Sequence, residues 1–432
     1  MKEKAPNLNI VEIIIILLNI SIVDTLISSI IFGNLDWYYH QSIIVFFNIL
    51  FLIVNSNKAK FYKQKSVKYY SIPLIIVFVL FIYETPRYFL AEFEGRNIIL
   101  SYLNAVAFIT FLLILNSTFN KYKMKFGSVK AYFILVKPYI YFSFLISFAA
   151  IIVFFLGKMN LINLFDYPAP SGFSFYIDNN AEQGSEYYFP LYITIIDNSP
   201  RGANFFMDTA LFSGLSHEPH IATYFMTPAF LLMFGVDDIS KSIKIFFSIV
   251  FVLFFLIATS LTNFLSLVII VLLFLSKRVI VNKKTLQIFI LLIIISIVLF
   301  STNSEKLGID NVLLKLSSVG GSKDYSVNFI RYVLTPTTVI GDGVFNVPYP
   351  YAKVDNIGFI SSMLIIVFYL SGFFISMKAI FQKNKLLSYT GLATFYFFLH
   401  SLKITQFVFV DTLTVFLLFV IIKAFKLKNT ND

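Results

Sequence analysis

The sequence predicts an all-α, polytopic integral membrane protein that crosses the bilayer about twelve times and forms a single transmembrane domain over residues 1–432. Hydrophobic residues make up 58% of the chain and charged residues only 13%, about half of the roughly 25% that soluble domains carry. Long apolar runs recur along the whole chain, and Lys and Arg are concentrated in short segments between them. A soluble fold cannot bury so much apolar surface, so the bilayer is the expected solvent.

Each apolar run is close to the ~20 residues that a helix needs to cross ~30 Å of hydrocarbon. The expected spans are roughly residues 10–32, 38–54, 69–83, 98–116, 131–156, 206–235, 245–258, 262–276, 285–300, 357–377, 386–402 and 404–422. Within the sixth span, Pro219 suits the first turn of a helix, where its missing N–H costs nothing. That helix is therefore expected to begin near Glu218.

The distribution of Lys and Arg orients the spans. An even number of spans places both termini on one side, and the segments of that side carry about 23 of the 34 Lys and Arg residues. Because cytoplasmic loops carry the excess of these residues, both termini are predicted to be cytoplasmic. The net charge of +11 thus reflects topology. A nucleic-acid partner is not expected, because it would need the basic residues on one folded face.

The loops are unequal in length. Every predicted cytoplasmic connection is short, whereas two outer segments, about 157–205 and 301–356, are long. No cytoplasmic segment is large enough to fold a nucleotide-sugar-binding domain. If the substrate is a sugar, it must therefore arrive already attached to lipid.

The densest group of polar side chains lies where the first long loop returns to the membrane. Its charged and imidazole residues are Arg201, Asp208, His217, Glu218 and His220. A helix that begins here would point its N-terminus outward, and such an end attracts phosphate, to which Arg201 can add a bidentate contact. Tyr224 lies four residues after His220, so the two side chains are expected on one helix face. The alternative is that these residues only cap the helix and solvate the loop.

The second long loop carries a similar set of side chains. Arg331 and Lys353 can bind phosphate, and Asp355 lies just before the next span. Tyr349 and Tyr351 can stack on sugar rings. An ordinary solvated outer loop is the alternative.

Neither a metal nor another cofactor is expected. The chain has no Cys, which excludes thiolate ligands. The run His-Glu-Pro-His-Ile at 217–221 differs from the zinc motif HExxH, which would require His at position 221. Gly341-Asp-Gly343 lacks the rest of a dinucleotide fingerprint.

One pattern resembles a known family. An outer-loop Arg201 is followed by Gly214 and by the Glu218–Pro219 pair that opens a helix; in the second loop Arg331 is followed by Gly341, Gly343, Asp355 and Gly358. This arrangement is similar to that of the O-antigen polymerases, which are relatives of the O-antigen ligases. The resemblance covers most of the chain as topology and some forty residues as motif.

The resemblance implies a GT-C-like membrane glycosyltransferase architecture in the bacterial inner membrane, with the active site in the two outer loops. It also implies transfer of a glycan from one undecaprenyl diphosphate carrier to another. Arg201 and Arg331 would bind the anionic carriers. A flippase and a chain-length regulator would be partners.

Residue chemistry then assigns the remaining roles. An acceptor hydroxyl must lose a proton, and His217, His220, Glu218 and Asp355 are the candidate bases. Arg201, Arg331, Lys353 and Tyr224 are the candidate substrate contacts. An O-antigen ligase, a flippase or other transporter, and an assembly factor without chemistry are the alternatives to a polymerase.

Overall fold

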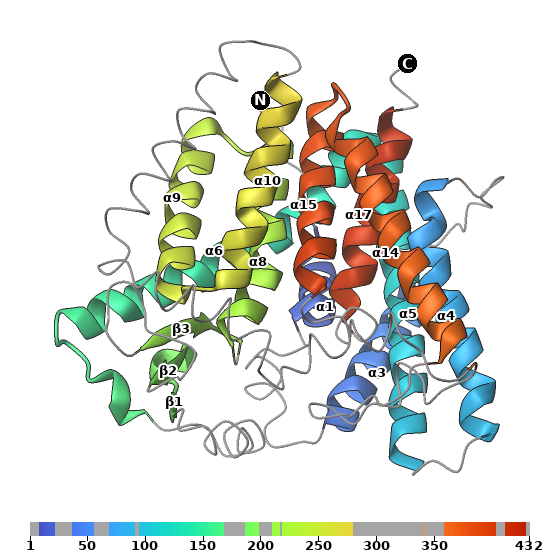
Figure 1. Ribbon diagram of the computed structural model, residues 1–432, viewed down its shortest axis with the longest axis horizontal. Helices are drawn as coiled ribbons and strands as arrows, with labels where there is room; N and C mark the ends of the chain where they lie inside the picture. Colours follow the sequence, from blue (N-terminus) through green and yellow to red (C-terminus); the bar gives the residue numbers. More distant parts are fainter. Residues whose placement is uncertain are drawn as a thin grey trace.

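The structure is a computed structural model of the chain. It describes residues 8–21, 37–55, 69–90, 95–167, 186–197, 210–216, 218–279, 339, 358–402 and 411–428 (Figure 1). This part of the chain is mostly helical, as the sequence predicts. Its α-helices are α1 (Ile10–Ser21), α3 (Trp37–Asn55), α4 (Ile72–Leu90), α5 (Gly95–Phe126), α6 (Ser128–Lys158), α8 (Pro219–Gly235), α9 (Lys241–Ala258), α10 (Leu261–Val279), α14 (Phe359–Ile380), α15 (Lys385–Ser401) and α17 (Thr412–Lys428).

These helices coincide with the apolar runs of the sequence. Each predicted span overlaps one of them except 285–300, which lies outside the described residues. Four helical segments are both long and apolar enough to cross a membrane: Tyr102–Phe126, Ser128–Lys158, Lys241–Ala258 and Phe359–Ile380. Crossing by the other helices stays a prediction.

The helices differ in what surrounds them. On α9 the outward side chains Ile245, Phe246 and Ile249 are at least half exposed, whereas Phe251 and Phe254 are fully buried. Every residue of the C-terminal helix from 411 to 425 is buried, so α17 is enclosed by protein on all sides. An apolar surface such as that of α9 is unusual on a soluble protein and suits contact with lipid chains.

A small antiparallel sheet interrupts the helical pattern, and the sequence did not predict it. Strands β1 (Glu186–Tyr188), β2 (Thr194–Asp197) and β3 (Leu211–Gly214) pair in the order β1–β2–β3. The prediction of one apolar span over 206–235 is therefore wrong for its first part, because residues 211–214 are a strand. The helix itself begins at Pro219, close to the predicted start near Glu218. Gly214 has φ +58, a left-handed conformation that a continuous helix cannot contain.

Gly214 also allows close packing at this place. A Cβ atom there would lie 3.2 Å from side-chain atoms of both Ile146 and Met226. Strand β3 contacts α6, α8 and α9, and Figure 1 shows the sheet below α8 and α9. The sheet thus lies against the end of the bundle at which α8 begins.

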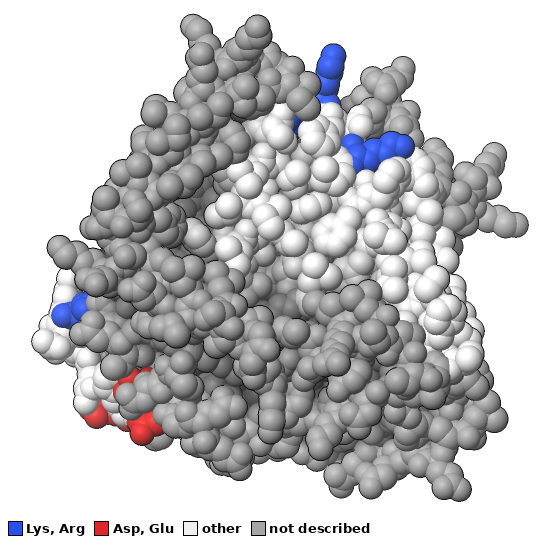
Figure 2. All heavy atoms as spheres, in the orientation of Figure 1, with Lys and Arg blue, Asp and Glu red and all other residues white. Residues whose placement is uncertain are grey.

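Charges separate between the two ends of the bundle. Three ion pairs lie on the side away from the sheet: Lys121–Glu12 at 2.6 Å, Lys137–Asp238 at 3.0 Å and Lys385–Asp237 at 2.7 Å. In Figure 2 most of the visible basic side chains lie at that end, and the acidic ones gather over the sheet. At the sheet, the hydroxyl of Tyr188 donates a hydrogen bond to Glu186. This bond, together with partial burial and the negative charges of Glu186 and Asp197, raises the pKa of Tyr188 to about 12.

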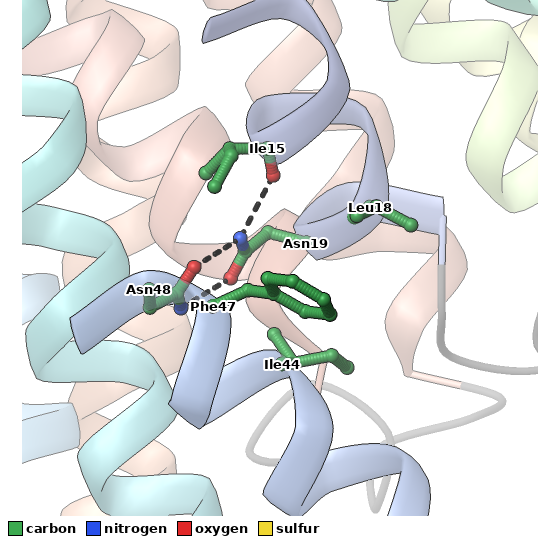
Figure 3. Close-up of a pocket in the computed structure, with 6 residues that line it drawn as sticks. All are labelled: Ile15, Leu18, Asn19, Ile44, Phe47 and Asn48. Carbon is green, nitrogen blue, oxygen red and sulfur yellow. Dashed lines mark hydrogen bonds between the residues drawn. The ribbon is translucent and has the colours of Figure 1, made fainter. Parts of the chain in front are cut away.

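A reciprocal amide pair joins α1 to α3 inside the bundle (Figure 3). Asn19 Nδ2 donates to Asn48 Oδ1 at 2.8 Å, and Asn48 Nδ2 donates back to Asn19 Oδ1 at 2.9 Å and to Thr110 Oγ1 of α5 at 3.1 Å. The hydroxyl of Thr412 donates to the carbonyl of Asn19. Such interhelical bonds contribute roughly 0.6–2 kcal/mol each in a membrane. The hollow lined by Ile15, Leu18, Ile44 and Phe47 around the pair has no room for a water molecule.

Candidate functional site

The candidate site begins at the first turn of α8. The helix starts at Pro219, which confirms the start predicted from the sequence. Glu218 is the preceding residue and is extended, with φ −137 and ψ 147. Its carbonyl accepts hydrogen bonds from the N–H groups of Ile221, at 3.2 Å, and Ala222, at 3.1 Å. The helix therefore offers a phosphate fewer free amides than expected, since Pro219 has none and that of Ile221 is already bonded.

The carboxylate of Glu218 turns to His220 instead of capping the helix. Glu218 Oε2 lies 2.9 Å from His220 Nδ1, and the two side chains are 13% and 14% exposed. This geometry suits a hydrogen bond in which Nδ1–H donates to the carboxylate, which would leave the lone pair on Nε2. A carboxylate in this position stabilises the imidazolium that forms when Nε2 takes a proton.

Tyr224 lies one turn further along α8 and deeper in the protein. It is 2% exposed, and its ring centroid is 5.3 Å from that of Phe397 and 5.8 Å from that of His400. The described structure thus gives Tyr224 a packing role beneath the Glu218–His220 pair. Its predicted contact with substrate stays a prediction.

Beneath the pair, His400 of α15 is fully buried and bonds to α8. Its Nε2 lies 2.9 Å from the backbone carbonyl oxygen of His220, and its Nδ1 lies 2.9 Å from the hydroxyl of Tyr396. That hydroxyl is 2.6 Å from Asn263 Oδ1 of α10, which also accepts from Thr227 at 2.9 Å. We call these four side chains, His400, Tyr396, Asn263 and Thr227, the buried polar network.

The position of each residue in its helix places its side chain in the network. Asn263 lies in the first turn of α10, where its N–H donates to Ser260 Oγ at 3.3 Å. The preceding α9 ends at Ala258, and the next residue, Thr259, has a left-handed φ of +46 that turns the chain into α10. Tyr396 and His400 are four residues apart on α15, so they share one face. The faces of α8, α10 and α15 therefore converge on the network.

The hydrogens of the network can be counted. A backbone carbonyl only accepts, so His400 Nε2 must carry a hydrogen. If Tyr396 donates to Asn263, then His400 Nδ1 must also carry one, and the imidazole is a cation. If the amide of Asn263 is turned so that Nδ2 faces Tyr396, the hydroxyl donates to Nδ1 and His400 is neutral. Both arrangements keep the Nε2 hydrogen on the carbonyl of His220.

A side chain from α6 also supports α8. Pro228 lies inside α8 and has no N–H, so the helix loses one internal hydrogen bond there. Near that break, the hydroxyl of Tyr139 on α6 donates to the carbonyl of Phe225. Asp411, which precedes α17, is also buried, and it accepts a hydrogen bond from the N–H of Leu413 at 2.8 Å.

Several predicted site residues lie outside the described residues. They are Arg201, Asp208, His217, Arg331, Tyr349, Tyr351, Lys353 and Asp355. Of the predicted site, the structure therefore places Glu218, His220 and Tyr224, and it brings the first two into contact. Among the described residues, no three His, Asp or Glu side chains gather into a set that can hold a metal ion.

The sequence analysis did not single out His400, Tyr396 or Asn263. The sequence does contain a signal for His400, because an imidazole within an apolar run is costly in a membrane and is by default a candidate for function. His400 is one of only four His residues in the chain.

Comparison of the chain with protein-family models, with curated protein sequences and with solved structures finds no match.

Proposed function

We propose that this protein joins lipid-linked oligosaccharide repeat units into a surface polysaccharide, as a glycosyltransferase of the O-antigen polymerase type. The observation that carries the proposal is the contact between Glu218 and His220, a partly exposed carboxylate–imidazole pair at the outer start of a buried helix. Such a pair is a suitable base for an acceptor hydroxyl. The motif resemblance and the predicted outer loops support the same reading.

The proposed reaction is a displacement at an anomeric carbon. The acceptor hydroxyl oxygen forms a bond to that carbon, and the bond from the carbon to the undecaprenyl diphosphate oxygen breaks. The hydroxyl proton passes to His220 Nε2, and Glu218 stabilises the resulting imidazolium. Arg201, Arg331 and Lys353 are proposed to neutralise the diphosphate as it leaves. His217 and Asp355 are the other candidate bases.

The proposal places the site on the outer face of a bacterial inner membrane, with both termini in the cytoplasm. The acidic sheet end of the bundle would then face outward, and the end with the Lys–Asp and Lys–Glu pairs would face inward. Repeat units would be delivered by a flippase, and a chain-length regulator would act on the product.

Deletion of the gene tests the function. The surface polysaccharide of the deletion strain is compared on a gel with that of the complemented strain. Core lipid that carries a single repeat unit would support a polymerase. Bare core with polymer left on its carrier would instead identify a ligase, and repeat units trapped on the cytoplasmic face would identify a flippase.

Transport is the second candidate, because the buried polar network lies within the bundle. The Glu218–His220 pair and the network together extend along α8 from Pro219 to Thr227, which is about 12 Å at 1.5 Å per residue. Polar residues inside a membrane bundle are typical of transport paths. The gel separates this candidate, since a transport defect leaves repeat units inside the cell.

A further inference from the structure

We propose that His400 is a positioning residue for the Glu218–His220 pair. It would act by holding the backbone carbonyl of His220 through its Nε2 hydrogen. This inference deepens the proposed function, because it names a buried residue on which the geometry of the outer pair depends. His400 is fully buried, so it has no direct contact with a substrate at the surface.

The contact between His400 and His220 joins two helices at one atom. The carbonyl of His220 accepts from His400 Nε2 at 2.9 Å and from Thr223 Oγ1 at 3.1 Å. The same residue directs its side chain to Glu218. A shift of this carbonyl would therefore move the residue that carries the imidazole of the pair.

The first turn of α8 needs such support. Pro219 supplies no N–H, and Glu218 uses its carboxylate for His220 and leaves the helix without a side-chain cap. Lack of a cap costs a helix roughly 0.5–2 kcal/mol. A contact from α15 instead holds this turn at a carbonyl: His400 Nε2 donates to that of His220, and the Tyr396 hydroxyl lies 3.3 Å from the carbonyl of Thr223.

Tyr396 and Asn263 fix the ring of His400. The hydroxyl of Tyr396 occupies Nδ1, so the ring cannot turn its other nitrogen toward α8 without losing that bond. An orienting partner on the second nitrogen is also how proteins set the tautomer of imidazoles in metal and catalytic sites. The buried polar network is thus arranged to keep a hydrogen on Nε2.

Three variants separate positioning from general stability. His400→Gln can place an amide N–H near the position of Nε2, whereas His400→Leu removes the donor but keeps an apolar side chain. Tyr369→Phe is the matched control, because its hydroxyl donates to the carbonyl of Ser401 at 3.2 Å. That buried bond also joins α15 to a neighbouring helix, α14, near the end of α15, and it does not involve α8.

The activity test uses the full chain in proteoliposomes. The substrate is undecaprenyl-diphosphate-linked repeat units extracted from the deletion strain, and rates are normalised to folded protein. We expect His400→Leu to lower kcat at least about tenfold with KM changed less than about twofold. His400→Gln should recover to within about threefold of wild type, and Tyr369→Phe should match wild type. An unchanged kcat in His400→Leu, or an equal loss in Tyr369→Phe, would overturn the proposal.

A second readout does not depend on activity. Protein labelled with ¹⁵N-histidine has ring signals from only four residues, so His220→Gln and His400→Gln assign both rings. We expect the His220 ring signals to shift in His400→Leu and to stay in place in Tyr369→Phe. If wild type makes no polymer but these shifts appear, the proposed function fails and the positioning contact stands. If the His220 signals do not move, the positioning contact is wrong.

Discussion

At the scale of single residues, the contact between Glu218 and His220 depends on a break in helical geometry. Side chains two positions apart in a helix do not face one another. Here Glu218 is extended and precedes the first turn, so its carboxylate can reach back along the helix to Nδ1 of His220. Pro219 between them fixes the point at which the helix begins.

Replacement of Glu218 tests the base. Glu218→Gln keeps the shape and the hydrogen-bond acceptor but removes the charge that stabilises the imidazolium. We expect kcat to fall by about 10²-fold, within the range for general base catalysis, with the protein level unchanged. Glu186→Gln is the control, since Glu186 is an exposed carboxylate on β1. For both variants, the length of the polysaccharide chains is measured on a gel. Chains of normal length in Glu218→Gln would show that Glu218 takes no part in the mechanism.

Substitution of Arg201 and Arg331, which lie in the two predicted outer loops, tests the proposed diphosphate contacts. Arg201→Ala and Arg331→Ala are each expected to abolish polymer while the protein level stays normal. Arg→Lys at either position should restore activity only in part, because the ammonium lacks the planar fork of the guanidinium. Immunoblots of membranes and polysaccharide gels measure the two quantities. Full-length polymer in either alanine variant would refute the assignment for that residue.

At this scale the sequence predicted the residues at the first turn of α8 but not the buried residues beneath them. Glu218 and His220 lie in a conspicuous polar run, whereas His400 and Tyr396 lie among Phe and Leu residues, as in any apolar span. Their importance depends on α15 lying beside α8, which no spacing in one sequence reveals. The sequence also does not show that Tyr224 is buried.

At the scale of elements, small residues set how closely helices approach. A Cβ atom on Gly391 of α15 would lie 2.8 Å from the Cβ of Ala379 and 2.9 Å from the carbonyl of Ser376, both on α14. Such close backbone contacts are typical of membrane helix pairs. Because α15 also carries His400, the packing of α14 bears on the site.

Substitution of Gly391 tests this packing. Gly391→Val should force α14 and α15 apart and cost about 1–3 kcal/mol, seen as a lower midpoint of thermal unfolding in detergent. Gly235→Ala is the graded control, because its Cβ would meet Tyr389 at 3.3 Å, so a small shift can accommodate it. Equal midpoints for Gly391→Val and wild type would show that the helices do not approach so closely.

The sequence predicted helices far better than strands. Apolar runs locate helices because each must satisfy its backbone groups within itself in lipid. The strands are only three or four residues long, and Tyr192, with φ +62, and Leu191, with φ +51, lie between β1 and β2. Segments this short carry no alternating pattern, and pairing between 194–197 and 211–214 depends on tertiary contacts with α6, α8 and α9.

At the scale of the whole molecule, the orientation of the bundle decides which end meets the substrate. The chain contains no Cys, so single cysteines can be introduced without a background. Glu186→Cys, at the sheet end, should react with a membrane-impermeant maleimide on intact spheroplasts. Lys383→Cys, in the turn between α14 and α15, should react only after permeabilisation. Both positions are exposed, so access to the reagent is the only variable, and the reverse pattern would invert the proposed topology.

The enclosure of α17 also has a consequence for how the protein is made. This helix packs against α1, α4, α5, α6 and α15, all of which precede it in the chain. The ribosome therefore delivers the central helix after the helices that surround it. If α17 lies in the membrane, as the sequence predicts, lipid chains would fill its place until residues 411–428 have left the translocon, and they would have to leave before the bundle can close. Assembly in the membrane would then end with the expulsion of lipid, and a separately expressed segment carrying α17 should be able to complete a chain that stops at residue 402.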